Sequence, residues 1–172
     1  MKIISGGQTG ADLGGLVAAK LHNLDTGGWM PKGFKTQAGP RPEYAKFFNL
    51  REHVSDSYKQ RTYSNVADAD ITIRIAVDFK SPGEKCTLNA IKAYGKPHYD
   101  VKIKEHQPVI LHNHVEDLLT WFCEESRNIK IVNIAGNSHK TWAGMQFYTQ
   151  TFLSLFFFRM GYHRLIFPKE YK

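Results

Sequence analysis

Cysteine is scarce in this chain of 172 residues. Its two copies, Cys86 and Cys123, lie far apart and in unlike surroundings, so they offer neither a disulfide framework nor the paired spacing of a zinc site. A reducing compartment fits this usage best. No serine stands in the glycine-flanked elbow of hydrolase nucleophiles, and neither cysteine has an evident histidine partner. The sequence therefore predicts no metal site and no covalent catalyst.

Long apolar runs are lacking as well. The longest, at residues 152–158, ends at Arg159 and is much shorter than the roughly 20 residues that cross a bilayer. The first residues lead directly into Ile3-Ile4 and glycine, without the apolar core and cleavage site of a signal peptide. We therefore expect a cytoplasmic protein without a membrane partner. So many aromatics in one run are hard to bury in a small domain, which suggests a subunit contact and a homo-oligomer.

Acidic residues are outnumbered, since 23 Lys and Arg face 16 Asp and Glu, for a formal net charge of +7. A positive surface attracts anions, which include nucleic acid, nucleotides and anionic cofactors. The basic residues are scattered along the chain rather than gathered in one stripe. Nucleic acid therefore stays an alternative partner that the sequence does not favour. The length suits a single domain, residues 1–172, with a core of its own.

The most informative stretch is residues 2–12, in which a short apolar run passes through a glycine-rich loop into a helical pattern. Glycine permits positive φ and close approach to a ligand, and the unpaired amides of a first helical turn favour anions. The loop lacks both the lysine of a P-loop and the alternating glycines of the dinucleotide fingerprint. It predicts a phosphate site, with a tight turn that binds no ligand as the alternative.

Strand and helix patterns alternate along the rest of the chain. We expect strands at 71–77, 98–103 and 130–135, a minor one at 109–111, and helices at 13–21, 56–68, 87–94, 115–125 and 144–160. The alternation predicts an α/β fold in which helices cover both faces of a mostly parallel sheet. Ligands of such sheets bind where strands end, so the loops after residues 5, 29, 77 and 136 should share one rim.

Residues 27–36 combine glycines, aromatics and lysines, and predict a second ordered binding loop that continues to Pro42. In this loop Trp29 either stacks on a planar ligand or anchors the loop to the core. On the following helix, Arg61 and Asn65 are four residues apart and share a face. They form either an oxyanion clamp or a surface arginine beside a solvated amide.

Residues 78–87 predict a third loop, in which Glu84 and Lys85 are the only charged pair well placed for chemistry. His112 and His114 flank a single residue, and we expect them in a loop. Without cysteine or carboxylate partners at zinc spacing they do not indicate a metal site.

Several separate motifs follow one another over roughly residues 3–148. They are Ser5-Gly-Gly-Gln-Thr-Gly10 with Asp12, Gly27-Gly-Trp-Met-Pro-Lys-Gly33, Gly39-Pro40, Pro42-Glu43-Tyr44, Tyr58, Arg61-Thr62, Asn65-Val66, Asp70 and Val132-Asn-Ile-Ala-Gly136. In this order they closely resemble the family named putative molybdenum cofactor carrier proteins. The resemblance implies a Rossmann-like three-layer sandwich, related to the Lonely Guy phosphoribohydrolases once mislabelled lysine decarboxylases. It also implies an oligomer, and molybdenum cofactor or a nucleotide-like anion as the ligand.

One departure bears on catalysis. Where the hydrolase relatives carry a catalytic glutamate, this chain has Asn89, and an amide cannot act as a general base. We therefore expect a carrier that binds a phosphorylated small molecule and has no catalytic residue. The alternatives are a phosphoribohydrolase that uses Glu84 or Asp12, and a nucleic-acid-binding protein. The predicted ligand-binding residues are Gly6, Gly7, Gln8, Thr9, Gly10, Asp12, Trp29, Lys32, Gly33, Arg61, Asn65, Pro82, Gly83, Glu84, Thr87 and Gly136.

Overall fold

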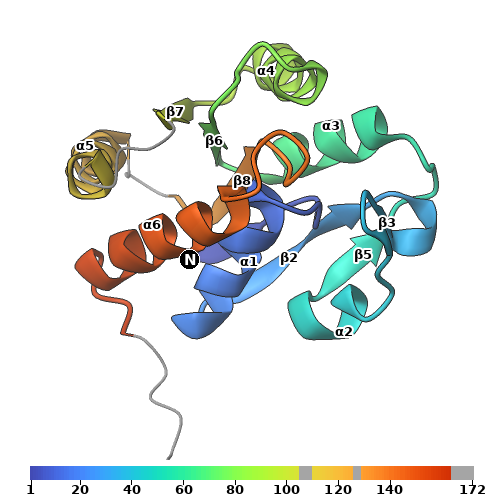
Figure 1. Ribbon diagram of the computed structural model, residues 1–172, viewed down its shortest axis with the longest axis horizontal. Helices are drawn as coiled ribbons and strands as arrows, with labels where there is room; N and C mark the ends of the chain where they lie inside the picture. The colour runs from blue at the N-terminus through green and yellow to red at the C-terminus, as the bar shows by residue number, and fades with distance from the viewer. Residues whose placement is uncertain (105–109, 126–128, 164–172) are drawn as a thin grey trace, which may run out of the picture.

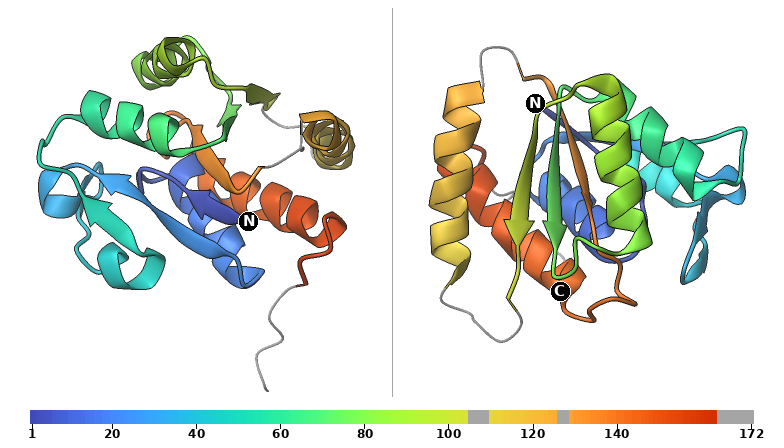
Figure 2. Two further views of the ribbon diagram at one scale, coloured as in Figure 1. Left: turned by 180° about the vertical axis from the view of Figure 1, so that it is seen from behind. Right: turned by 90° about the horizontal axis from the view of Figure 1, so that it is seen from above.

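The computed structural model describes residues 1–104, 110–125 and 129–163, and its centre is a parallel sheet (Figure 1). The six strands lie in the order β5-β2-β1-β8-β6-β7. Their bounds are β1 (Lys2–Ile4), β2 (Asp25–Met30), β5 (Leu50–Glu52), β6 (Ile71–Ala76), β7 (His98–Lys102) and β8 (Ile131–Gly136). Every pairing among them is parallel, and Figure 2 shows β6, β7 and β8 running the same way. The predicted Rossmann-like α/β fold is confirmed.

Helices cover both faces of the sheet (Figures 1 and 2). One face carries α1 (Ala11–Leu21), α5 (Ile110–Glu125) and α6 (Met145–Arg159), and the other carries α3 (Tyr58–Asp68) and α4 (Pro82–Tyr94). The short α2 (Tyr44–Phe48) packs beside β5. A 3-10 turn η1 (Lys32–Phe34) and the antiparallel pair β3 (Lys35–Thr36) and β4 (Gly39–Pro40) lie between β2 and α2. None of the described helices is both long and apolar enough to cross a membrane.

The core lies between the sheet and the α1, α5 and α6 layer. Strand β6 is buried along its whole length, as its β-branched sequence predicted. The aromatic run of α6 belongs to the same core, because Phe152, Phe156 and Phe157 are fully buried. The expectation that these rings need a second subunit to cover them is therefore wrong, although Phe158 is half-exposed. The homo-oligomer stays a prediction.

The expected second loop begins too early, because residues 27–30 belong to strand β2. Glycine is unfavourable inside a strand, yet the structure explains why glycine is required at position 28. It has φ 122°, and a Cβ at this position would lie 2.1 Å from the carbonyl oxygen of Ser5. Only glycine lets β2 approach β1 so closely.

Two further boundaries were wrong. Helix α4 begins at Pro82 rather than Thr87, because proline is well accommodated in the first turn of a helix. Helix α5 begins at Ile110, so His112 and His114 lie on a helix and not in a loop. The same helix takes up Ile110 and Leu111 of the expected minor strand, whereas residue 109 lies outside the described residues.

Candidate functional site

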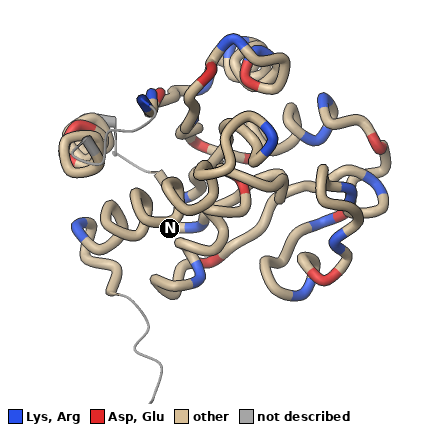
Figure 3. The backbone as a smooth tube through the Cα atoms, in the orientation of Figure 1, with Lys and Arg blue, Asp and Glu red and all other residues tan. Residues whose placement is uncertain are grey.

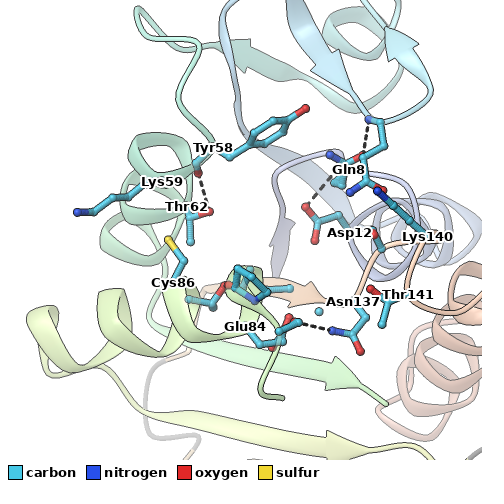
Figure 4. A pocket seen from close by; sticks show the side chains of 18 of the residues that line it. Gln8, Asp12, Tyr58, Lys59, Thr62, Glu84, Cys86, Asn137, Lys140 and Thr141 are labelled. Atoms are coloured by element: carbon cyan, nitrogen blue, oxygen red, sulfur yellow. Dashed lines mark hydrogen bonds between the residues drawn. The ribbon is translucent and has the colours of Figure 1, made fainter. Parts of the chain in front are cut away.

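A cavity of about 590 Å³ opens at the carboxyl edge of the sheet (Figure 4). The loops that follow β1, β6 and β8 form much of its wall, as predicted for a sheet of this kind. Helices α1, α3 and α4 and the β3–β4 hairpin supply the rest. The lining residues are Gln8, Asp12, Gln37, Tyr58, Lys59, Arg61, Thr62, Ser81, Pro82, Gly83, Glu84, Cys86, Thr87, Ala135, Gly136, Asn137, Ser138, Lys140 and Thr141.

The cavity gathers one half of the predicted ligand-binding residues and leaves out the other half. Those in its wall are Gln8, Asp12, Arg61, Pro82, Gly83, Glu84, Thr87 and Gly136. Those outside the wall are Gly6, Gly7, Thr9, Gly10, Trp29, Lys32, Gly33 and Asn65.

The amides of the opening loop already bind groups of the chain itself. The N–H of Gly7 donates to the Ser5 hydroxyl at 3.1 Å, and the N–H of Gln8 donates to the Asp12 carboxylate at 3.3 Å. The N–H of Thr9 donates to the side-chain oxygen of Gln8 at 2.9 Å. The negative group held by this loop is thus the chain's own Asp12 carboxylate.

The glycines of this loop serve close packing. A Cβ on Gly6 would lie 1.5 Å from Nη1 of Arg61, whose guanidinium therefore rests directly on the loop. Gly10 has φ 97°, and its Cβ would lie 2.5 Å from the backbone oxygen of Asn137 in the loop after β8. The glycines that resemble those of a phosphate loop thus also let α1, α3 and the loop after β8 pack closely together.

Asp12 and Arg61 form a buried ion pair, with 3.1 Å between Oδ2 and Nη1. Burial raises the pKa of Asp12, and the Arg61 charge and the loop amides oppose that rise. Nε of Arg61 is buried without a hydrogen-bond partner in the described structure. Arg61 therefore keeps one unused donor, which is buried against the opening loop.

Glu84 lies in the first turn of α4 and is only 1 % exposed. Burial raises the pKa of its carboxyl to about 8, with the opposing Arg74 charge second in effect and Asp12, Asp100 and Asp78 adding to the rise. At neutral pH this carboxyl is therefore mostly protonated. Across the cavity from it stands Asp12, which reaches the same space from α1 (Figure 4).

The sequence reasoning overlooked Arg74, which lies in the middle of β6 and is 2 % exposed. Its guanidinium forms a two-point contact with Asp100 of β7, and its Nη1 donates to the Glu84 backbone oxygen at 3.3 Å. Nη1 also lies 3.6 Å from the Glu84 carboxylate. The signal was available, because an arginine inside an otherwise apolar buried strand requires a buried partner.

Asn137 was overlooked as well, and it joins the loops after β6 and β8. Its side-chain oxygen accepts the N–H groups of Val77 and Asp78 at 3.0 and 2.8 Å. Its amide nitrogen donates to the Asp78 carbonyl and to the Ser81 hydroxyl. Asn137 thus positions the residue that precedes α4.

Residues 3–157 match the model of the circularly permutated YpsA SLOG family. The chain belongs to this family. A crystal structure of a putative molybdenum carrier protein from Syntrophus aciditrophicus is similar to it, with a TM-score of 0.81 and 31% sequence identity. That similarity covers 90% of this chain and 93% of the other. No functionally curated protein matches the chain.

Trp29 and Asn65 have structural roles in this SLOG-family chain. The Asn65 side chain accepts the N–H of Trp29 at 2.8 Å and donates to its carbonyl at 3.0 Å, which ties α3 to β2. The Trp29 indole donates to Asp68, and the Arg51 guanidinium covers its ring at 3.9 Å. Of the two interpretations of Trp29, the anchor fits these contacts. Among the other residues outside the cavity wall, Gly33 donates its N–H to Glu52.

A second, smaller hollow contains a serine and a histidine at 3.3 Å, namely Ser64 Oγ and His53 Nε2. The N–H of Ser55 donates to Nδ1 of His53, so the proton of the neutral ring lies on Nε2. A protonated Nε2 cannot accept the serine proton, so this pair is no activated nucleophile. The described residues also hold no group of three or more His, Cys, Asp or Glu that could bind a metal.

Proposed function

We propose that this chain binds and carries an anionic, phosphorylated small molecule in the cavity, with molybdenum cofactor or a nucleotide-like compound as the ligand. Membership of the SLOG family and the likeness to a putative molybdenum carrier protein support a carrier. The observation that carries the proposal is the start of α4, which forms part of the cavity wall through Ser81, Pro82 and Gly83.

The phosphate is best accommodated at this helix start rather than at Gly6 to Gly10. The Ser81 side chain makes no capping bond to the helix. Pro82 has no N–H and that of Lys85 donates to the Ser81 carbonyl, so the N–H groups of Gly83 and Glu84 are the ones that we assign to the anion. The helix dipole adds positive potential at the same place. Lys140 also lines the cavity and supplies positive charge, whereas the Lys59 ammonium points away from the cavity (Figure 4). The loop at Gly6 to Gly10 then contributes Gln8 to the cavity wall and holds Asp12 and Arg61 in place.

A planar ring fits the other part of the cavity. Tyr58 lies at its wall with 43% of its surface exposed, and the Arg61 guanidinium lies 5.9 Å from the centroid of its ring (Figure 4). The planar ring of the ligand would stack on the part of Tyr58 that Arg61 leaves uncovered. Stacking of a base on an aromatic side chain contributes about 1–3 kcal/mol. We therefore expect Tyr58→Ala to weaken binding of adenosine monophosphate about tenfold or more, and binding of molybdate much less.

Isothermal titration calorimetry tests the proposal with purified molybdenum cofactor, molybdate, tungstate and a panel of nucleoside monophosphates. We expect heat of binding from at least one phosphorylated compound, and at least a fivefold loss of affinity in Lys140→Ala. Lys46→Ala is the matched control, because Lys46 is an exposed lysine of α2 that is not part of the cavity wall. Absence of heat from every compound would overturn the proposal.

A phosphoribohydrolase is the second candidate, and the facing carboxyls of Asp12 and Glu84 are the observation that favours it. A protonated Glu84 would give its proton to the departing base as the N-glycosidic bond breaks, while Asp12 would accept a proton from the water that attacks the sugar carbon. The test is release of free base from nucleoside monophosphates, which Glu84→Gln should abolish and the exposed Glu43→Gln should not. If no base is released, the hydrolase candidate is rejected and the carrier remains the proposed function.

A further inference from the structure

Glu84 is an unusual residue for the wall of an anion site. It is nearly inaccessible to solvent, and its Oε2 atom has no hydrogen-bond partner in the described part of the chain. The residue stands in the first turn of α4, beside the amides that the proposed function assigns to the anion. A buried carboxyl with an unused oxygen is costly unless a ligand or a proton completes it.

Charged groups on several elements around the cavity act on Glu84. Arg74 of β6 lies 3.6 Å from Oε2, but its guanidinium is shared with Asp100 of β7. From α1 comes Asp12, which is already paired with Arg61 of α3, and Asp78 approaches from the loop after β6. Lys140 lines the cavity from the loop after β8. The surrounding carboxylates therefore leave little positive charge to stabilise an ionised Glu84.

We propose that Glu84 binds the ligand in its protonated form, donating a hydrogen bond from its carboxyl to an oxygen of the bound anion, so that binding takes up a proton in alkaline solution. This inference rests on the proposed function, since it concerns the same cavity. An ionised Glu84 would repel the anion, whereas a neutral carboxyl donates to it.

Linkage gives the expected size of the effect. The pKa of Glu84 is about 8 without ligand, and a bound anion raises that pKa further. The affinity should then fall about tenfold between pH 7 and pH 9, because an increasing share of the protein must first take up a proton. Uptake of about half a proton per ligand is expected at pH 8.

Calorimetry at pH 7.0, 8.0 and 9.0 tests the inference with adenosine monophosphate and molybdate as probes. A phosphomonoester loses its second proton at about pH 6, so the charge of adenosine monophosphate changes little between pH 7.0 and pH 9.0. Repeating the pH 8.0 titration in two buffers of different ionisation enthalpy counts the protons taken up. Glu84→Gln replaces the titrating donor with an amide that does not titrate. We expect a flat profile and no proton uptake in Glu84→Gln, and therefore about tenfold tighter binding than the native chain at pH 9.0.

Glu43→Gln is the matched control, because it makes the same replacement at an exposed residue outside the cavity wall. It should keep the native pH profile and proton uptake. Binding whose affinity follows the same pH profile in the native chain and in Glu84→Gln would overturn the inference and leave the proposed function intact. Failure of both probes to bind at any pH would also overturn it, whereas the proposed function falls only if molybdenum cofactor and the other nucleotides fail as well.

Discussion

Arg74 is the single residue on which the candidate site most depends for its shape. It is buried in β6 and connects Asp100 of β7 to the first turn of α4 through the Glu84 carbonyl. A buried cation of this kind holds the helix start in place, because its contacts with Glu84 are made in a low-dielectric interior, whereas the Asp100 side chain is 39% exposed. Its removal leaves the acidic groups around it without their counter-charge.

We expect Arg74→Met to lower the free energy of unfolding by about 2–4 kcal/mol, because it removes the charged partner of a buried network. Urea denaturation measures the change. Arg51→Met is the control, since Arg51 pairs with Asp68 at an exposed position where both side chains are about half accessible. An exposed pair contributes roughly 1 kcal/mol or less. Equal losses in the two variants would contradict the assignment of Arg74.

Glu84 gives a prediction for stability against pH. Its pKa rises from 4.5 to about 8 on folding, so between these values the unfolded chain releases a proton that the folded chain retains. The native protein therefore loses stability as pH rises from 4.5 to 8, by roughly 3 kcal/mol at pH 7. Glu84→Gln should escape this loss. Denaturation curves at pH 5, 6, 7 and 8 should show that the free energy of unfolding of the variant rises relative to that of the native chain as the pH rises. A difference that stays constant with pH would contradict the prediction.

At the scale of elements, the opening loop acts as a packing device between α1, α3 and the loop after β8. Gly10 is its most constrained residue, because it combines positive φ with a backbone oxygen in the space of its missing Cβ. We expect Gly10→Ala to lower the free energy of unfolding by about 2–4 kcal/mol. Gly83→Ala is the control, since Gly83 has open space around its Cβ position and should change stability by about 1 kcal/mol or less. Thermal and urea unfolding compare the two, and an equally mild Gly10→Ala would contradict this role.

The same elements show how far the sequence leads. Local patterns identified β6 from its run of β-branched residues and α1 from apolar residues at helical spacing. The pattern could not reveal the start of α4, where proline and glycine are compatible with both a loop and a first helical turn. It also could not tell that the amides of the opening loop bind Asp12, since a glycine serves ligand approach and chain packing equally well. Fewer than half of the residues in the cavity wall were predicted from the sequence, and the rest of the site depends on contacts distant in sequence, such as that of Arg74 with Asp100.

At the scale of the whole molecule, the positive charge is distributed and not concentrated. Figure 3 shows Lys and Arg spread over several helices and loops of the described chain, with Asp and Glu between them. A nucleic-acid interface requires a continuous basic surface that follows the phosphate backbone. The excess of positive charge instead raises the local concentration of small anions, which the cavity then selects.

The salt dependence of the affinity distinguishes binding of a small anion in the cavity from binding of nucleic acid on the surface. A small anion held in the cavity engages one or two basic side chains, so the logarithm of its affinity should fall with that of the salt concentration with a slope of about −1 to −2. A single-stranded oligonucleotide that crosses the surface would neutralise many lysines and give a slope steeper than about −4. We expect the shallow slope for adenosine monophosphate by calorimetry, and no tighter binding of a 20-nucleotide strand by fluorescence anisotropy. Tight and steeply salt-dependent binding of the strand would contradict this prediction. A steep slope means that many phosphates are neutralised, which the scattered lysines could do and a cavity that accepts one phosphate could not.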